Sequence, residues 1–226
     1  MASRKWPLGA SVLAALPWFV PLPAEDPQQP ARPRLLSEAS EIEMALSAAP
    51  KHLRDGAGVY VLRAHGFVRE RESRNGFTCI VNRDHPLSRK PVCYDAEGTT
   101  TVLPVVLREG ELLMKGMRPE KIRAEIAAGF RDGKFISPRR PGVAYMLSHD
   151  ALDFDARARR AVPLPPRIMF YAPNLTNQDI GSTGNGADGL PFIAYSGPQA
   201  SMVVIPRPDR AKRSVEQSAT GTTSNE

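Results

Sequence analysis

The sequence predicts a single small α+β domain, with a mixed or antiparallel sheet, a helical hairpin and one N-terminal helix. Short runs rich in Val, Ile, Tyr and Phe occur over residues 59–94 and again after residue 142, as is typical of strands. Between them, apolar residues recur at helical spacing over residues 102–130. The 22 prolines among 226 residues disfavour long uninterrupted helices. A composition of 42% hydrophobic and 24% charged residues is that of a globular protein.

Residues 1–24 have the pattern of a secretory signal peptide. Arg4 and Lys5 give a charged start, an apolar middle follows over residues 6–20, and the segment ends in Ala24. Two prolines interrupt the apolar run, which is shorter than the ~20 residues of a spanning helix. A permanent membrane anchor and a structureless cytoplasmic extension are the alternatives. Cleavage after residue 24 removes two lysine or arginine residues and no acid, so the formal charge changes from +6 to +4.

A linker is expected over residues 25–36, because this proline-rich segment has no apolar periodicity. The domain is expected over residues 37–208. Its first helix is predicted from the capping box of Ser40 and Glu43, and Pro50 ends it. One apolar face of this helix consists of Ile42, Ala45, Leu46 and Ala49.

Residues 59–63 and 65–70 predict a β-hairpin, with its turn over residues 64–66. Two further extended segments follow. The first contains Phe77, Ile80 and Val81, and the second spans residues 91–94.

The only two cysteines, Cys79 and Cys93, lie on these extended segments. A structural disulfide between them is the preferred interpretation in an oxidising compartment. The alternatives are a pair of free buried thiols and a catalytic Cys79 served by His65 or His85, although no motif places either histidine.

Two helices are predicted over residues 102–114 and 119–131, and they form a hairpin hinged at Gly116. Pro104 and Pro119 fall in the first turns, where the missing N–H is harmless. Met114 and Met117 near the hinge are interpreted as core residues rather than as metal ligands.

The last part of the chain returns to strands, over residues 142–148, 167–172, 192–195 and 201–206. Their nearly continuous apolar runs predict central strands buried on both faces. Residues 209–226 are polar and are expected to form a disordered tail.

The sequence has no Walker or Rossmann glycine pattern, no G-x-S-x-G elbow and no internal repeat, which lowers the expectation of the commonest enzyme classes. Basic residues gather around the first hairpin and the cysteine loop, and they are interpreted as an exposed polar edge. Interleaved acids and few aromatic residues argue against nucleic-acid binding. The basic residues are Arg69, Arg71, Arg74, Arg83, Arg89 and Lys90.

A ligand site is a candidate after the strand at 167–172, because polar side chains beyond a buried strand often form sites. The alternative is that Asn174 or Thr176 caps a short helix and that the glycines at 181–189 form a mobile loop. The candidate residues are Tyr171, Asn174, Thr176, Asn177 and Asp179.

The segment 149–155 places Asp150, Asp153 and Asp155 beside His149. These oxygens could converge on a hard cation, but their spacing matches no calcium loop. A solvated charge patch, neutralised by nearby arginines, is the preferred interpretation, so no metal site is expected.

Four blocks together resemble a family of uncharacterised, exported bacterial proteins: NGFTC at 75–79, CYDAEG at 93–98, RPGVAYMLS at 140–148 and MFYAPNLTNQDIG at 169–181. The resemblance covers residues 42–206. It implies secretion and a shared domain, and it transfers no catalytic or binding residue.

These observations together predict an exported protein, periplasmic or extracellular, that acts as a binding or structural module of the cell envelope. A hydrolase-like envelope enzyme, with a site near residues 171–181, is the alternative. No cofactor, no nucleic acid and no membrane anchor after signal cleavage are expected. The candidate partner is a small molecule or an envelope component.

Overall fold

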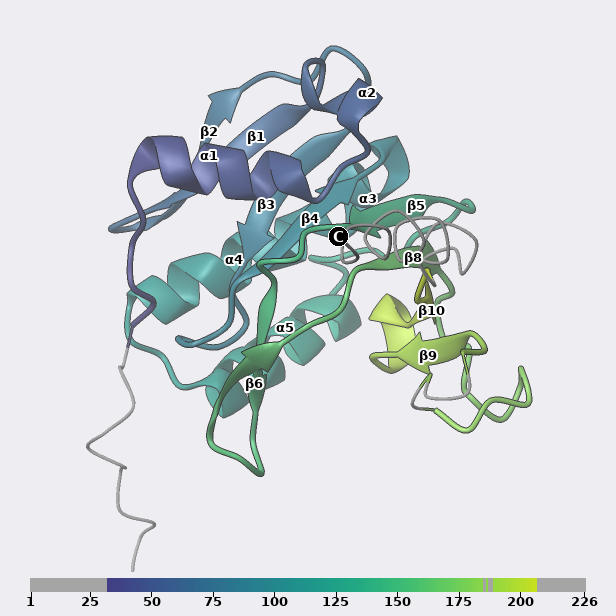
Figure 1. Ribbon diagram of the computed structural model, residues 1–226. Helices are drawn as coiled ribbons and strands as arrows, with labels where there is room; N and C mark the ends of the chain where they lie inside the picture. Colours follow the sequence, from purple (N-terminus) through teal and green to yellow (C-terminus); the bar gives the residue numbers. More distant parts are fainter. Residues whose placement is uncertain (1–31, 185, 187–188, 207–226) are drawn as a thin grey trace, which may run out of the picture.

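The computed structural model describes residues 32–184, 186 and 189–206, and these form one α+β domain (Figure 1). This described part of the chain contains five α-helices, an eight-stranded mixed sheet and a separate two-stranded sheet. The predicted fold class is therefore confirmed. The predicted signal peptide (1–24), most of the predicted linker and the predicted tail (209–226) lie outside the described residues.

The eight strands follow the order β2-β1-β3-β4-β5-β8-β10-β9, and all neighbours are antiparallel except β1 and β3. The predicted hairpin, cysteine strands and C-terminal strands are all present. The strands are β1 (Gly58–Arg63), β2 (Gly66–Arg71), β3 (Thr78–Asn82), β4 (Lys90–Tyr94), β5 (Val143–Met146), β8 (Arg167–Tyr171), β9 (Phe192–Ala194) and β10 (Ser201–Val204). A separate hairpin consists of β6 (Leu152–Asp155) and β7 (Arg160–Pro163).

Helix α1 (Glu38–Ser47) begins earlier than the capping box predicts. Its N-cap is Ser37, whose side-chain oxygen accepts a hydrogen bond from the N–H of Ser40 at 3.2 Å. Ser40 therefore lies in the first turn, and the prediction that it is the cap was wrong. Starting at Ser37 brings Glu41 into the first turn as well, where the helix dipole favours a carboxylate.

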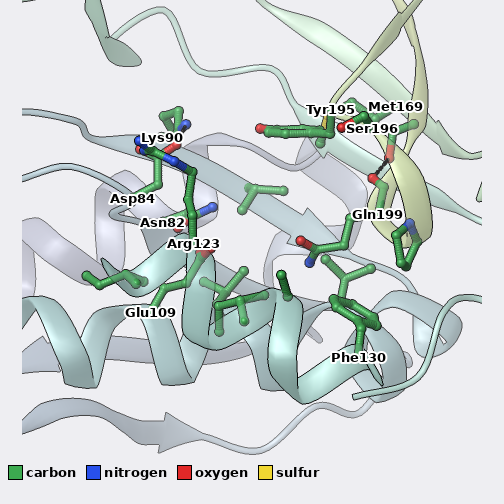
Figure 2. A pocket seen from close by; sticks show the side chains of 18 of the residues that line it. Asn82, Asp84, Lys90, Glu109, Arg123, Phe130, Met169, Tyr195, Ser196 and Gln199 are labelled. Atoms are coloured by element: carbon green, nitrogen blue, oxygen red, sulfur yellow. Dashed lines mark hydrogen bonds and ion pairs between the residues drawn. The ribbon is translucent and has the colours of Figure 1, made fainter. Parts of the chain in front are cut away.

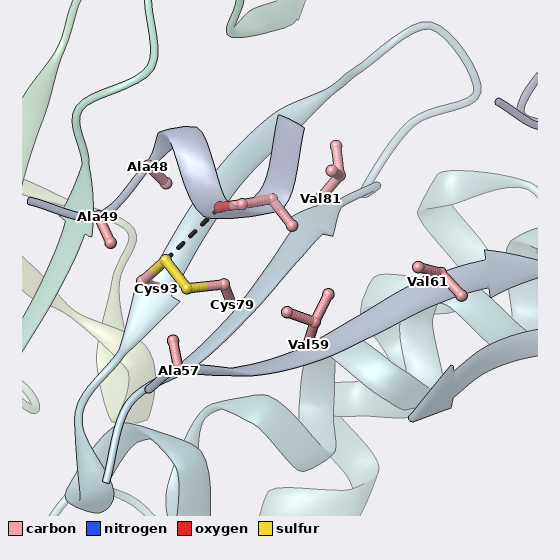
Figure 3. Close-up of a cluster of buried hydrophobic side chains, with 9 residues drawn as sticks. Ala48, Ala49, Ala57, Val59, Val61, Cys79, Val81 and Cys93 are labelled. Carbon is pink, nitrogen blue, oxygen red and sulfur yellow. Dashed lines mark hydrogen bonds between the residues drawn. A yellow bond between two sulfur atoms is a disulfide. The ribbon is translucent and has the colours of Figure 1, made fainter. Parts of the chain in front are cut away.

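Helix α1 packs on β1, β3 and β4, on what we call the first face of the sheet (Figures 1 and 3). Cys79 and Cys93 are directly opposite each other in β3 and β4, with an S–S distance of 2.01 Å, and both are fully buried beneath α1. The Cys93 sulfur lies 3.5 Å from the carbonyl oxygen of Ala45. Ala45 of the helix and Ala48, its C-cap, are small enough to allow this close approach. The structure thus supports the disulfide over the free or catalytic thiols.

The second face carries Ile80, Val92 and Tyr94, and α4 (Leu103–Met114) packs on it. Helix α5 (Pro119–Arg131) packs in turn on α4, so the predicted helical hairpin is confirmed. Gly116 connects the two with a φ of 78°, a conformation that glycine adopts without strain.

Two short helices were not predicted, α2 (Lys51–Arg54) and α3 (Ala96–Thr101). Helix α3 has Asp95 as its N-cap, which accepts a hydrogen bond from the N–H of Gly98 at 2.9 Å. An added Cβ at Gly98 would lie 1.9 Å from the Tyr171 hydroxyl oxygen, so this turn requires a glycine.

The strands β5, β8 and β10 are not buried on both faces, and that prediction was wrong. Burial alternates along β5 and β10, because the second face is packed while α1 covers only β1, β3 and β4 of the first face. The side chains that these three strands direct to the first face remain in contact with solvent, and Phe170 among them is 40% exposed. They are Val143, Tyr145, Ile168, Phe170, Met202 and Val204.

Candidate functional site

A cavity of about 600 Å³ lies between the second face of the sheet and the helices α4 and α5 (Figure 2). Strands β4, β5, β8 and β10 form one wall of it, and the segment 195–199 contributes further lining residues. Tyr195 of that segment has a φ of 61° and is 55% exposed, and its ring extends across the cavity in Figure 2.

Most of the cavity wall is apolar, because apolar residues recur at strand and helix spacing in the elements that form it. Alternation along β4 and β5 brings every second side chain to the second face, and helical spacing does the same for one side of α4 and of α5. This wall could accommodate the apolar body of a ligand. Its members include Val92, Tyr94, Val106, Ile122, Ile126, Phe130, Met146 and Met169.

One end of the cavity is charged, and Lys90 is its centre. Lys90 shares the second face with Val92 because the two are two residues apart on β4, and it is only 3% exposed. Its ammonium group pairs with Asp84 and lies 3.4 Å from Asp153. Burial opposes the charge on Lys90, but the facing oxygens of Tyr195, Asp84 and Asp153 outweigh it, so the pKa of Lys90 is raised.

Two side-chain oxygens at this end have no hydrogen-bond partner in the part of the chain that the structure describes. They are the Oδ1 atoms of Asn82 and Asp84, and both are buried. Burial raises the pKa of Asp84, yet the neighbouring Lys90 charge and hydrogen bond lower it below its ordinary value. Ser88 and the N–H of Asp84 itself also lower this pKa, so Asp84 is ionised at neutral pH, while its Oδ1 atom accepts no hydrogen bond from the described residues.

Glu109 of α4 is the second acidic residue, after Asp84, that lines the large cavity. It is half-buried, and no described side chain forms a hydrogen bond or ion pair with it. Burial, reinforced by the negative charge of Asp84, raises its pKa to about 7 despite the opposing charge of Lys90. Glu109 therefore changes its protonation state within the physiological range.

A second cavity of about 180 Å³ shares Asp84, Lys90 and Tyr195 with the first. It adds Asp153 and Arg167 to the polar end. Burial lowers the pKa of Arg167 from its ordinary value, while Tyr195 and Asp153 oppose the shift.

Of the five candidate ligand residues in the sequence, only Tyr171 lines the large cavity. Its hydroxyl donates to Oδ1 of Asp95 at 3.1 Å and lies 3.2 Å from the carbonyl oxygen of Val143. This arrangement joins β8 to the N-terminus of α3. Tyr171 therefore forms part of the wall with its hydroxyl already bonded.

The other four candidates lie in and around a turn after β8. The Thr176 hydroxyl donates to the Asp179 carboxylate at 2.7 Å, and both side chains are exposed, as is Asn174. Asn177 accepts a hydrogen bond from the N–H of Ile193 at 2.7 Å and thus holds β9 in place. None of the four lines either cavity.

The aspartates of the segment 149–155 have different partners, because the β6–β7 hairpin begins within this segment. Asp153 faces Lys90, whereas Asp155 accepts hydrogen bonds from the N–H groups of Arg157 and Ala158 in the hairpin turn. No group of three or more His, Cys, Asp or Glu side chains among the described residues is arranged to hold a metal ion.

The basic residues of the first hairpin and cysteine loop do not all form an exposed edge, which corrects the prediction. Arg83 is 1% exposed and Lys90 is 3% exposed. Alternation along the strands turns Lys90 into the cavity and Arg83 to the first face, where it pairs with Glu41 at 2.9 Å.

The main functional candidates, Lys90, Asp84 and Glu109, were not predicted from the sequence as site residues. The apolar periodicity of the sequence does indicate two of them. Lys90 alternates with the buried Val92, and Glu109 is seven residues after Val102 on the apolar side of its helix. A charged residue in an apolar periodicity indicates a group directed into the interior.

The fold and the site define a one-domain α+β protein with a ligand-sized cavity that is apolar along its length and charged at one end. No family model, curated protein or solved structure matches the chain. In the described ranges, no helix is long and apolar enough to cross a membrane.

Proposed function

We propose that this protein is an exported binding module that holds a small amphipathic molecule in the large cavity. The cavity itself carries the proposal, because its ≈ 600 Å³ falls within the ~300–1,000 Å³ of typical ligand sites. A mostly apolar wall with a few convergent polar groups is also typical of such sites. Lys90, Asp84 and Glu109 supply those polar groups.

Two observations support export. The first 24 residues have the pattern of a signal peptide, and a buried disulfide fits an oxidising compartment. Membership of the exported bacterial family that the four sequence blocks resemble is part of the same proposal. N-terminal sequencing of the protein from its native host tests export, and recovery of an intact Met1 in the cytoplasm would contradict it.

The enzyme alternative is supported by one observation, the carboxylate of Glu109 with a pKa of about 7 inside a cavity. A hydrolase also needs an activated nucleophile next to a base. Ser196 and Ser201 line the cavity, but no histidine or cysteine is among the described lining residues. Binding is therefore the better-supported function.

Filling the cavity tests the proposal. Ala127 of α5 lines the cavity and is exposed, so Ala127→Trp adds an indole there with little cost in folding. We expect wild-type protein to bind the neutral fluorescent probe N-phenyl-1-naphthylamine, and Ala127→Trp to weaken that binding by about tenfold or more. Fluorescence titration measures both affinities.

The matched control is Ala124→Trp, since Ala124 is an exposed alanine of the same helix that does not line the cavity. It should bind the probe as wild type does. Equal affinity of all three proteins, or no binding by any of them, would contradict the proposal. Mass spectrometry of an organic extract of the protein from its host then identifies the native ligand.

A further inference from the structure

Three side chains at the charged end of the cavity carry oxygens that accept no hydrogen bond from the described residues. The Oδ1 atoms of Asn82 and Asp84 are buried, and the Glu109 carboxylate has no ion-pair partner in this part of the chain. Lys90 is the main donor here, and it already pairs with Asp84 and lies 3.4 Å from Asp153. Any polar group that enters this end therefore meets unsatisfied oxygens.

The nearby arginines do not supply the missing donor. Arg123 of α5 lines the cavity, but its side chain is 68% exposed and pairs with Glu120 at 3.4 Å. Arg167 lines only the smaller cavity, where its Nε donates to the carbonyl oxygen of Pro165 at 3.2 Å. The carboxylates of Asp84, Asp153 and Glu109 thus outnumber the ammonium of Lys90 around the charged end.

We propose that this end binds the ammonium group of a cationic amphiphile, a primary amine attached to an apolar body. Glu109 is the counter-ion, and the free oxygens of Asp84 and Asn82 accept the remaining N–H groups. A primary ammonium has three N–H donors, which matches these three acceptors. An anionic head group would instead approach three carboxylates. This inference rests on the proposed function and specifies the ligand of the same cavity.

Binding of an amine should release a proton from the protein. Glu109 must be ionised to act as counter-ion, and its pKa in the free protein is about 7. Asp84 and Lys90 face Glu109 and keep their charges across neutral pH. Tyr94 also faces it and stays neutral, because burial raises its pKa.

Two other groups are close to this end. The charge of Lys90 lowers the pKa of Tyr195, but desolvation of its hydroxyl inside the cavity and the nearby carboxylates raise it by more, so the phenol also stays neutral although the residue as a whole is 55% exposed. His85 lies next to Asp84 and stacks on Phe154, and burial lowers its pKa below the ordinary value. Glu109 is thus the group expected to control binding between pH 6 and pH 8, with amine affinity falling about tenfold per pH unit well below pH 7.

The experiment compares three probes with the same chain, octylammonium, 1-octanol and octanoate, as competitors of N-phenyl-1-naphthylamine at pH 5.5 and pH 8. At pH 8 we expect octylammonium to bind about tenfold or more tightly than 1-octanol, and octanoate to bind more weakly than both. At pH 5.5 the preference for octylammonium should be largely lost. Calorimetry in buffers of different ionisation enthalpy should detect proton release near pH 6.

Glu109→Gln removes the counter-ion and keeps the shape of the side chain. It should abolish both the preference for octylammonium over 1-octanol and the dependence of that preference on pH. The matched control is Glu111→Gln on the same helix, which makes the same charge change at a residue that pairs with Arg108 and Lys115 outside the cavity. This control should behave as wild type.

Tighter binding of octanoate than of octylammonium at pH 8 would overturn the inference, as would an amine affinity independent of Glu109. In either case the proposed function would still stand, provided that the protein binds N-phenyl-1-naphthylamine and 1-octanol. Failure of every probe to bind would overturn the function and the inference together.

Discussion

Arg83 and Glu41 show how much one buried side-chain pair contributes to this fold. Their side chains are 1% and 2% exposed, and one guanidinium nitrogen of Arg83 donates to both carboxylate oxygens at 3.2 and 2.9 Å. The Nε and the other terminal nitrogen of Arg83 have no partner among the described residues. Burial raises the pKa of Glu41 and lowers that of Arg83, and each charge partly offsets the shift of the other. Each charge is therefore stabilised by the other in the buried interior.

Removal of one member of this pair should destabilise the protein strongly. We expect Glu41→Ala to lower the free energy of unfolding by about 3–5 kcal/mol, because it leaves the Arg83 charge buried without a counter-ion. Urea denaturation measures this loss. The double variant Glu41→Leu/Arg83→Met should recover much of it, since it removes both charges.

Glu43→Ala is the matched control for this prediction, because Glu43 is an exposed glutamate of the same helix. It should change the free energy of unfolding by no more than about 0.5 kcal/mol. If Glu41→Ala were as mild as Glu43→Ala, the buried pair would not have the role assigned to it.

At the scale of elements, the β3–β4 pair joined by the disulfide is the centre of the domain. It has α1 on the first face and α4 on the second, and its cysteines are 14 residues apart in the sequence. A crosslink over a loop of this length restricts the unfolded chain and thereby stabilises the folded one.

The double variant Cys79→Ala/Cys93→Ala should accordingly lose about 3 kcal/mol of unfolding free energy. Urea denaturation with and without reductant measures the effect, and reductant should leave the double variant unchanged. Intact mass of the non-reduced wild type should show the two-hydrogen deficit of a disulfide. Labelling of both cysteines by a thiol reagent in the folded, non-reduced protein would disprove the bond.

Elements were easier to predict from the sequence than the site they enclose. The helical hairpin and the hairpin of β1 and β2 depend on local periodicity and turn residues, and both are present as expected. The cavity depends on contacts between residues far apart in the chain, such as Lys90 of β4 with Asp153 of β6. Local pattern contains no information on that pairing, so only Tyr171 of the candidate residues lines the cavity.

Across the whole molecule, the sheet is covered unequally. Its first half lies between α1 and α4, whereas β5, β8 and β10 have a packed second face and a partly exposed first face. Stability against local opening follows the amount of buried apolar contact. The C-terminal half should therefore open more readily than the half that contains the disulfide.

Hydrogen exchange can test this difference on two matched strands. Both β3 and β10 have a hydrogen-bonded strand on each side. They differ in that α1 covers the first face of β3 but not that of β10. We expect amides of β10 to exchange about tenfold or more faster than those of β3, as measured by mass spectrometry at neutral pH. Equal protection of the two strands would show that the uneven cover has no effect on local stability.

The sequence by itself determined the fold class, the order of most elements and the two cysteine strands, because each depends on residues close together in the chain. Two things were decided only by the tertiary structure. One is burial: Arg83 and Lys90 belong to the same basic stretch, yet strand alternation directs them to opposite faces, where Glu41 and Asp84 neutralise them. The other is the site, since the pKa of Glu109 is raised by burial and by Asp84, a residue 25 positions earlier that only folding brings near.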